Sequence, residues 1–172
     1  MEVRRLRASD DRATFRSGDE ALDRFFRRFA GQNQFRHHLG VTYVAVEGEH
    51  LLGFATVAPR HLEIEALPAA ARKGLPACPV PVLGLARLAV DQAAQRQGVG
   101  AALLRTVLLL AHELSEDVGC AGVVVDAKPD AVSFYEKLGF MALDVIEGES
   151  DARPRLTAMS LPIGAIQAAR RK

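Results

Sequence analysis

The order of apolar and polar residues along the 172-residue chain predicts an alternation of strands and helices. Short stretches in which apolar residues alternate with polar ones, or follow one another, predict strands, because successive side chains of a strand point to opposite faces. The predicted strands are 3–7, 42–46, 51–57, 83–90, 122–125, 141–146 and 156–161. Apolar residues at helical spacing and helix-end signals predict helices over 21–35, 98–114 and 129–138, with a further short helix near 69–73.

The first predicted helix is amphipathic. One face is apolar and consists of Leu22, Phe25, Phe26 and Phe29. The opposite face is basic and consists of Arg24, Arg27 and Arg28. The strand over 83–90 is apolar almost throughout, which predicts a central and buried position. The helix over 129–138 has Pro129 near its first turn and Gly139 just past its end, as helix termini prefer. The order of elements predicts a mixed α/β sheet, of the α+β kind, with helices on both faces.

The composition indicates a folded protein in a reducing compartment. Hydrophobic residues make up 49% and charged residues 25%, close to the globular average, which excludes a disordered chain. The beginning of the chain has no apolar run after its charges, and no stretch is long enough to span a bilayer, so we expect neither a signal peptide nor a membrane partner. Cys78 and Cys120 cannot form a disulfide scaffold, and no Cys/His spacing indicates a metal site. We therefore expect one cytoplasmic domain over 1–172, with a basic tail over about 163–172.

The net charge of +1 hides an uneven distribution. Residues 113–151 are rich in Asp and Glu, whereas residues 24–38 hold no acid and four arginines, Arg24, Arg27, Arg28 and Arg36. Such segregation permits a cationic face that binds a polyanion. Charge alone favours the simpler interpretation that these are solvated surfaces.

The stretch 95–100, QRQGVG, follows the apolar strand and enters the long helix. The first amides of a helix have no partner within the helix and lie at the positive end of its dipole. Gly98 and Gly100 have no side chain that would keep a ligand away from those amides. The stretch therefore predicts an anion nest of the size of a pyrophosphate.

Three interpretations of this glycine pair compete: a loop without a ligand, a dinucleotide-binding turn, and a coenzyme A pyrophosphate loop. A dinucleotide-binding turn needs glycines directly after the strand and a third glycine where Leu103 stands, whereas residues 92–97 separate strand from glycine here. The Gly-Lys-Ser/Thr of an ATP-binding phosphate loop is missing. The nest therefore predicts a nucleotide that is neither NAD nor ATP.

The second informative stretch is 133–140, SFYEKLGF, on the later helix. Taken alone, Tyr135 is more typical of a core face than of a catalytic one, because Ala131, Val132 and Leu138 surround it in the helical pattern. Only one helix and one strand separate this stretch from the glycine loop. This order predicts that the later helix returns beside the strand end that precedes the loop.

In this combination and order, the motifs resemble the GNAT acyl-CoA-dependent N-acetyltransferases over most of the chain. The resemblance implies a central, splayed, mostly antiparallel sheet flanked by helices, with acetyl-CoA as the cofactor and no metal. It implies that the pantetheine arm binds the strand backbone and that the pyrophosphate binds the loop amides. The implied cofactor-binding residues are Leu88, Ala89, Val90, Gln95, Arg96, Gln97, Gly98, Val99, Gly100, Ala101 and Tyr135. Tyr135 is also implied to be the general acid, while Lys128 departs from the Asn that is common at its position.

The N-terminal half is similar to the acetyltransferase toxins of bacterial toxin–antitoxin pairs. The residues that carry this similarity are Phe15, Gly18, Leu22, Asp23, Phe25, Phe26, Ala30, Gln32–Gln34, Thr42–Val44 and Leu85–Asp91. It implies acetylation of the α-amino group of aminoacyl-tRNA, which blocks translation, as well as a homodimer and a small ribbon-helix-helix antitoxin. The candidate tRNA-binding residues are Arg24, Arg27, Arg28, Arg36 and Arg87. Two other functions stay open: a GNAT enzyme that acts on a small amine or a protein N-terminus, and a non-catalytic acyl-CoA-binding regulator.

The chemistry of the acceptor is compatible with aminoacyl-tRNA. A free lysine, with a pKa near ~10.4, would need a general base, whereas an α-amino group near ~7.7–8.0 is partly neutral already. The sequence offers no obvious base, because its histidines form no clear dyad and Glu63 or Asp126 would have to act through water. The coenzyme A thiolate leaves more easily with a proton donor in reach, which is the role expected of Tyr135.

Overall fold

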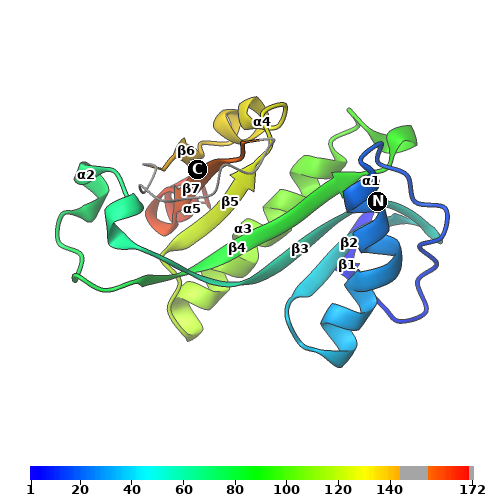
Figure 1. The fold of residues 1–172 in the computed structure, drawn as a ribbon, viewed down its shortest axis with the longest axis horizontal. Helices are drawn as coiled ribbons and strands as arrows, with labels where there is room; N and C mark the ends of the chain where they lie inside the picture. Colours follow the sequence, from blue (N-terminus) through cyan, green and yellow to red (C-terminus); the bar gives the residue numbers. More distant parts are fainter. Residues whose placement is uncertain (144–154, 171–172) are drawn as a thin grey trace. The chain divides into compact units, whose positions relative to one another are not determined.

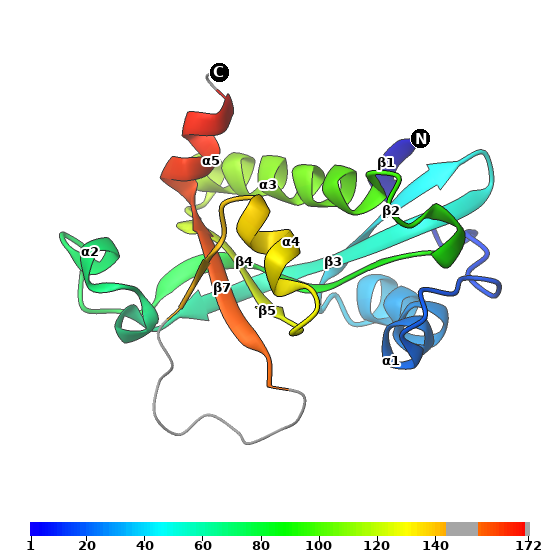
Figure 2. The same ribbon diagram turned by 90° about the horizontal axis from the view of Figure 1, so that it is seen from above.

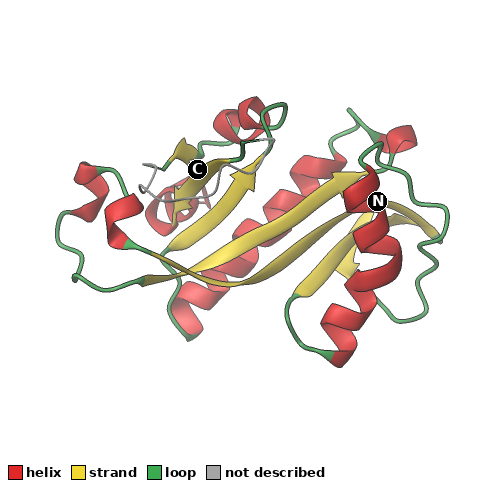
Figure 3. Cartoon of the chain, in the orientation of Figure 1, coloured by secondary structure: helices red, strands yellow, loops and turns green. Residues whose placement is uncertain are grey.

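The computed structural model describes residues 1–143 and 155–170. The chain forms two compact units: unit 1 consists of Met1–Ala58 and Leu85–Leu109, and unit 2 of Pro59–Gly84 and Leu110–Lys172. Over the described residues the strands form a seven-stranded sheet in the order β1-β2-β3-β4-β5-β7-β6 (Figures 1 and 3). Strands β3 (His50–Leu62) and β4 (Val80–Val90) have residues in both units. The organisation of these units as one domain stays a prediction.

The strands of unit 1 confirm the alternating pattern at the start of the chain. β1 (Glu2–Arg5) pairs antiparallel with β2 (Val41–Glu47), and β2 pairs antiparallel with β3. The register of β2 and β3 shifts between Ala45 and Val46. The predicted strands over 3–7, 42–46 and 51–57 are thus present, although β3 continues to Leu62.

The first predicted helix is present, but its geometry was not predicted. It consists of α1 (Glu20–Arg24) followed by two π-helical segments, η1 (Phe25–Phe29) and η2 (Gln32–Arg36). The side chain of Asp19 caps its beginning by accepting hydrogen bonds from the amides of Ala21 and Leu22 at 3.0 and 3.1 Å. Sequence periodicity cannot distinguish such segments from an α-helix, because they change the number of residues per turn only locally.

Three aromatic rings form the centre of the core of unit 1. Phe26 stacks on Phe54 of β3 at 4.3 Å between ring centroids, and Phe15 meets both rings edge-on at 4.8 and 5.5 Å. Leu6 and Val44 are buried in the same cluster. Of the apolar face predicted for the first helix, Leu22, Phe25 and Phe26 pack on one face of the sheet of unit 1 (Figure 1). Phe29 is exposed, contrary to the prediction, because the π-helical segment η1 changes the number of residues per turn.

The opposite face of β3 is covered by the beginning of α3 (Val99–Asp117). Successive residues of a strand point to opposite faces, so Gly53 faces away from the side on which Phe54 packs. A Cβ atom at Gly53 would lie 2.9 Å from the Ala89 carbonyl oxygen, 3.0 Å from the Val99 side chain and 3.1 Å from the Leu103 side chain. In unit 1, the prediction of helices on both faces is therefore confirmed.

In unit 2 the later strands lie side by side. β5 (Gly122–Ala127) pairs antiparallel with β7 (Thr157–Pro162), and β7 pairs with β6 (Met141–Ala142) (Figure 2). Residues 144–146 of the predicted strand over 141–146 lie outside the described residues. A second core cluster includes Leu62, Val80, Val82 and Val124.

The helices of unit 2 include one that the sequence did not predict. α2 (Ala69–Arg72) and α4 (Val132–Lys137) confirm the predicted short helix and the later helix, and a 3₁₀ turn, η3 (Ile64–Ala66), precedes α2. The prediction of a basic tail over 163–172 is corrected, because α5 (Ile163–Arg170) occupies most of it. Ile166 is buried and anchors this helix, whereas the basic residues lie only at its end.

Among the described residues, no helix is long and apolar enough to cross a membrane. The same residues include no group of three or more His, Cys, Asp or Glu side chains that could hold a metal ion.

Candidate active site

The end of β4 is fixed by Asp91, the first residue after the strand. Its amide donates to the Leu52 carbonyl at 2.8 Å. One carboxylate oxygen of Asp91 accepts from the Ala93 amide at 3.0 Å, and the other accepts from the Arg16 amide at 2.9 Å. Asp91 thus caps the short 3₁₀ turn η4 (Gln92–Ala94) and joins it to the N-terminal segment.

The two glutamines of the glycine loop support its backbone. The Gln95 side chain donates to the carbonyl oxygens of Ser17 and Val90 at 2.9 and 3.2 Å. The Gln97 side chain donates to the Ala93 carbonyl at 2.9 Å. These side chains hold the loop in place, so we assign any role in ligand binding to the main chain of these two residues.

The loop backbone has the geometry expected of an anion nest. Arg96 and Gly98 have φ angles of 62° and 82°, in the left-handed region. A Cβ atom at Gly98 would meet nothing within 4 Å, so the space in front of this residue is open. The Ala102 amide donates to the Gly98 carbonyl at 3.0 Å, which leaves the amides of Val99, Gly100 and Ala101 before the first such bond of α3. These observations fit the diphosphate of a coenzyme A ligand.

The strand that leads to the loop is less buried than its apolar sequence predicts. Ala86 and Arg87 are exposed, and Leu88 and Val90 are only half-buried, whereas Ala89 is buried. The predicted central position of the strand over 83–90 is confirmed, because β4 lies between β3 and β5, but its predicted burial is wrong for most of the second half. An apolar run identifies a strand that avoids water, but it does not distinguish cover by protein from cover by a ligand.

A pocket of about 750 Å³ in unit 1 borders the loop at Gln97 and Val99. Its lining includes four acidic side chains, those of Asp11, Glu47, Glu49 and Asp91. Carboxylates repel a diphosphate, so the loop amides, and not this pocket, are the part of unit 1 that suits one.

Tyr135, the expected general acid, lies on α4 in unit 2. It is buried, and the rings of Phe134 and Phe140 meet it edge-on at 5.1 and 5.4 Å. Gly139 ends the helix with a φ of 89°, and the Phe140 amide then donates to the Tyr135 carbonyl at 3.1 Å. The helix end therefore brings Phe140 back onto the Tyr135 ring.

Burial raises the pKa of Tyr135 to about 12, so the phenol keeps its proton at neutral pH. The described part of the chain offers this hydroxyl no hydrogen-bond partner, and the hydroxyl is not among the unpartnered polar atoms that are closed off from solvent. At neutral pH the hydroxyl has a proton to donate, and as a phenol of raised pKa it is a weaker acid than an exposed tyrosine.

The two carboxylates considered as bases, Glu63 and Asp126, line one pocket of about 120 Å³ in unit 2. Asp126 forms an ion pair with Arg60 at 3.0 Å, and both side chains are partly exposed. His61 lines the same pocket. The Asp126 carboxylate already has the Arg60 guanidinium as a partner, which makes it a weaker candidate for a general base than a carboxylate without one.

The candidate tRNA-binding arginines all belong to unit 1. Arg24, Arg27 and Arg28 line one pocket, and Arg36 is exposed on η2. The Arg87 guanidinium lies over the Phe25 ring at 3.9 Å, and desolvation lowers its pKa while leaving it charged. Arg12 lines the same pocket as Arg24, Arg27 and Arg28, but the sequence analysis did not identify it. It lies outside the arginine-rich stretch, so no pattern indicated it.

Comparison with known proteins identifies the class of protein to which this site belongs. A family model described as an acetyltransferase (GNAT) domain matches residues 38–142. The chain therefore belongs to the GNAT acetyltransferase family.

One relative in sequence and two solved structures of the toxin AtaT are similar to this chain. The tRNA-acetylating toxin of Mycobacterium tuberculosis (strain ATCC 25618 / H37Rv) is 32% identical over 140 residues, which cover 80% of this chain and 82% of that protein. The structure of AtaT complexed with acetyl-methionyl-tRNAfMet is 28% identical, with a TM-score of 0.86 over 98% of both chains. A tyrosine-to-phenylalanine mutant of the AtaT toxin, bound to the C-terminus of the antitoxin AtaR and to acetyl-CoA, is 25% identical, with a TM-score of 0.80 over 99% of this chain and 98% of that one.

Proposed function

We propose that this protein transfers the acetyl group of acetyl-CoA to the α-amino group of aminoacyl-tRNA and so acts as a translation-blocking toxin of a toxin–antitoxin pair. The observation that carries the proposal is the likeness, over nearly the whole of both chains, to a toxin solved with acetyl-methionyl-tRNAfMet. The open amides at the beginning of α3 support the acetyl-CoA half of the proposal, because they suit a diphosphate.

Acetyl-CoA supplies an acetyl group that its thioester activates toward amines. The backbone of Gln95–Ala101 would hold the diphosphate, and the backbone of Leu88–Val90 would hold the pantetheine arm. The Gln95 and Gln97 side chains contribute by fixing the loop, since both hydrogen-bond to main-chain carbonyls. Preorganised amides of this kind bind without reorganising during the reaction.

Tyr135 supplies the proton that the reaction needs at sulfur. The amine nitrogen forms a bond to the acetyl carbon, the carbon–sulfur bond breaks, and the leaving thiolate takes the phenol proton. The proton that the amine loses restores the phenol through solvent, so the products are an amide and a thiol. Because burial raises the pKa of Tyr135 to about 12, the phenol carries this proton at every physiological pH.

The acceptor amine needs little help to lose its own proton. An α-amino group with a pKa of about 8 is partly neutral at pH 7.5. The pairing of Asp126 with Arg60 is compatible with this acceptor, which needs no strong general base. A lysine acceptor would leave far less of the reactive amine.

The arginines Arg24, Arg27, Arg28, Arg36 and Arg87 would contact tRNA phosphates. All five are cations of unit 1, and three of them surround one pocket. A relative solved with the C-terminus of its antitoxin supports an antitoxin partner for this chain too. We propose further that the antitoxin is of the ribbon-helix-helix type, that the enzyme is a homodimer and that it acts in the cytoplasm.

The test uses acetyl-CoA with a labelled acetyl group and total charged tRNA. We expect label in the tRNA fraction, at the α-amino group of one or a few aminoacyl residues, and release of coenzyme A in equal amount. Uncharged tRNA is the control and should stay unlabelled. Transfer of label to small amines or protein N-termini, with none to charged tRNA, would replace this function with that of an ordinary GNAT enzyme. No coenzyme A release with any acceptor would indicate a binding protein.

A further inference from the structure

A pocket of about 550 Å³ lies between the N-terminal segment and the first helix of unit 1. We call it the Arg12 pocket, and its lining residues are Asp10, Asp11, Arg12, Ala13, Glu20, Arg24, Arg27 and Arg28. Four of these side chains are arginines, so the pocket concentrates guanidinium groups that come from two separate segments of the chain.

Two nitrogens of the Arg12 guanidinium group have no hydrogen-bond partner among the described residues. Its Nε and Nη1 atoms are buried and make no hydrogen bond within the described residues. The group packs against the helix at Gly31, where a Cβ atom would lie 3.2 Å from Nη2 and 3.7 Å from Cζ. Burying a charged donor without a partner costs free energy, so native proteins nearly always satisfy such groups.

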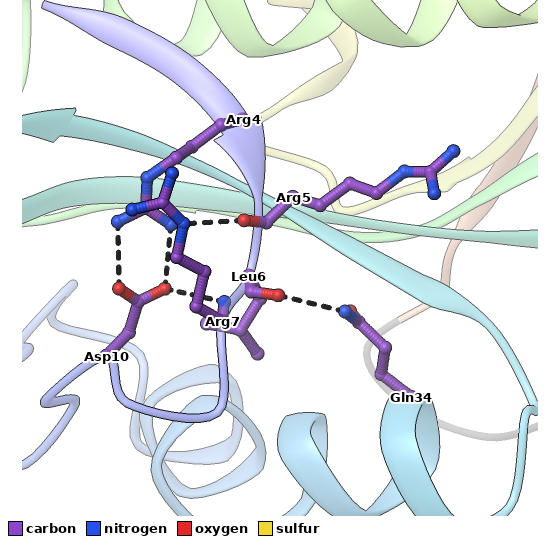
Figure 4. A network of polar contacts seen from close by, with 6 residues as sticks. All are labelled: Arg4, Arg5, Leu6, Arg7, Asp10 and Gln34. Atoms are coloured by element: carbon purple, nitrogen blue, oxygen red, sulfur yellow. Dashed lines mark hydrogen bonds and ion pairs between the residues drawn. The ribbon is translucent and has the colours of Figure 1, made fainter.

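Three carboxylates line the pocket. Those of Asp10 and Asp11 bond to groups other than Arg12, and Glu20 is exposed at the beginning of the helix. Asp10 accepts two hydrogen bonds from the Arg4 guanidinium, at 2.8 and 2.9 Å, and a third from the Arg7 amide at 2.7 Å (Figure 4). The hydrogen bonds from Arg4 lower the pKa of Asp10, which keeps this carboxylate ionised and paired. Asp11 accepts from the Ala13 amide at 2.9 Å.

The segment that carries Arg12 is fixed in place, so the pocket exists before any ligand binds. The bidentate pair of Arg4 and Asp10 closes the turn after β1. Gln34 joins the same region to the helix by donating to the Leu6 carbonyl at 3.0 Å (Figure 4). Its side chain also accepts from the Thr42 amide at 2.7 Å. On the helix side, the Arg27 Nε donates to the Asp23 carbonyl at 3.2 Å, which fixes the direction of that side chain.

We infer that the Arg12 pocket is a phosphate-binding pocket that receives a backbone phosphate of the tRNA acceptor. Guanidinium groups present several donors in one plane, which matches the oxygens of a phosphate, and the four arginines of the pocket outnumber its three carboxylates. The pocket shares Arg24, Arg27 and Arg28 with the basic face of the helix, so a phosphodiester chain that follows that face would reach Arg12. This inference rests on the proposed function for the source of the phosphate, but not for the chemistry of the pocket.

The first test compares acetylation of charged tRNA by the wild type, Arg12→Gln, Arg12→Lys and Arg105→Gln. Arg105 is exposed on α3 and lines none of the pockets described above, so Arg105→Gln removes the same charge elsewhere in unit 1. We expect Arg12→Gln to raise KM for aminoacyl-tRNA by about 10- to 100-fold, with kcat nearly unchanged, because one charge-assisted phosphate contact is lost. The slope of log KM against log salt should fall by about one, as for one fewer phosphate contact. Arg12→Lys should lie between these values.

The second test does not depend on tRNA. Thermal unfolding is measured with increasing inorganic phosphate, at saturating coenzyme A so that the glycine loop does not respond. Phosphate should raise the melting temperature of the wild type and of Arg105→Gln, but not that of Arg12→Gln. Without phosphate, Arg12→Gln should be at least as stable as the wild type, since it removes buried donors that have no hydrogen-bond partner among the described residues.

Together, the two tests show whether the phosphate-binding pocket and the proposed function stand or fall independently. A phosphate response that needs Arg12, without acetylation of any charged tRNA by the wild type, would support the pocket and overturn the proposed function. Acetylation of charged tRNA with a KM for Arg12→Gln within twofold of the wild type would overturn the inference and leave the function standing. If phosphate does not raise the melting temperature of the wild type, the pocket holds water. If citrate, tested in the same way, raises the melting temperature and phosphate does not, the pocket binds a carboxylate partner such as an acidic peptide. Both results contradict a phosphate-binding pocket.

Discussion

The two candidate functional regions, the glycine loop of unit 1 and Tyr135 of unit 2, are held by different kinds of interaction. In unit 1, the loop from Gln95 to Ala101 is supported by hydrogen bonds from side chains to the main chain, and the groups proposed to bind a ligand are amides. In unit 2, Tyr135 is held by apolar packing, and the group proposed to act is one hydroxyl. The loop depends on backbone conformation, whereas Tyr135 depends on the identity of one side chain.

This difference separates binding from chemistry. A change in the loop alters the positions of several amides together, so its effect should appear in the affinity for acetyl-CoA. A change of the Tyr135 hydroxyl removes a proton donor but leaves the ring in its packing, so its effect should appear in the rate. The predictions below test this division, from the largest effect to the smallest.

Replacement of Tyr135 by Phe should lower kcat by about 10²–10⁴-fold, because the leaving thiolate loses its proton donor. The ring contacts with Phe134 and Phe140 remain, so the Kd for acetyl-CoA should change less than twofold. Calorimetry of acetyl-CoA binding and steady-state acetylation give the two values. Equal kcat in Tyr135→Phe and the wild type would exclude Tyr135 as the general acid.

Replacement of Gly98 by Ala should act in the opposite way and raise the Kd for acetyl-CoA by about 5- to 100-fold. Gly98 has a φ of 82°, which costs an alanine about 1–3 kcal/mol, and the loop would relax away from its nest geometry. Space is not the cause, because a Cβ atom here meets nothing within 4 Å.

Gly48→Ala is the matched control for this substitution. Gly48 also has a positive φ, of 60°, and also has open space, but it lies in the turn between β2 and β3. It should lower the melting temperature by a similar amount while acetyl-CoA affinity stays unchanged. An equal loss of affinity in both variants would attribute the Gly98 effect to general destabilisation.

Much of the fold could be predicted because its elements repeat simple patterns. In the strands over 42–46 and 51–57, apolar residues alternate with polar ones or follow one another. Phe25 and Phe26 mark the buried side of the first helix. The π-helical segments could not be predicted, since a local change of winding leaves the apolar spacing almost unaltered. The helix α5 was missed because arginines at the end of the chain suggested a solvated tail, although Ile166 is buried.

The candidate site residues came from patterns that are local in sequence, and their roles stay predictions. Gly98 and Gly100 stand on either side of Val99 where the loop enters α3, and Tyr135 stands in a short motif. The Arg12 pocket was not predictable, because it joins residues 10–13 to residues 20–28 through tertiary contacts. The support roles of Gln95 and Gln97 were also hidden, since their partners at Ser17, Val90 and Ala93 are set by the fold.

Replacement of Gln95 by Leu should raise the Kd for acetyl-CoA by about 3- to 10-fold. Its side-chain amide donates to Ser17 and Val90, and each such bond on an exposed side chain contributes about 0.5–1.5 kcal/mol. Calorimetry measures the change, and Gln92→Leu is the control for the loss of a neighbouring exposed glutamine. An unchanged Kd in Gln95→Leu would show that the loop keeps its form without this support.

The packing around Tyr135 should also be visible in its ionisation. The chain has two tyrosines, so Tyr43→Phe leaves Tyr135 as the single phenol, and its ionisation can be followed by ultraviolet absorbance. Because burial raises the pKa of Tyr135 to about 12, roughly a tenth of it should be ionised at pH 11, whereas an exposed tyrosine would be about nine-tenths ionised.

The direction in which pH changes the stability follows from the same shift in pKa. The unfolded phenol ionises from about pH 10 and the folded one only near 12, so the free energy of unfolding should fall between these values, by about 2–3 kcal/mol. Circular dichroism at each pH identifies the folded range, and Tyr43→Phe/Tyr135→Phe supplies the blank. A midpoint near pH 10 in the folded protein would mean that water reaches the ring, and apolar packing would then not be what holds the proton on Tyr135.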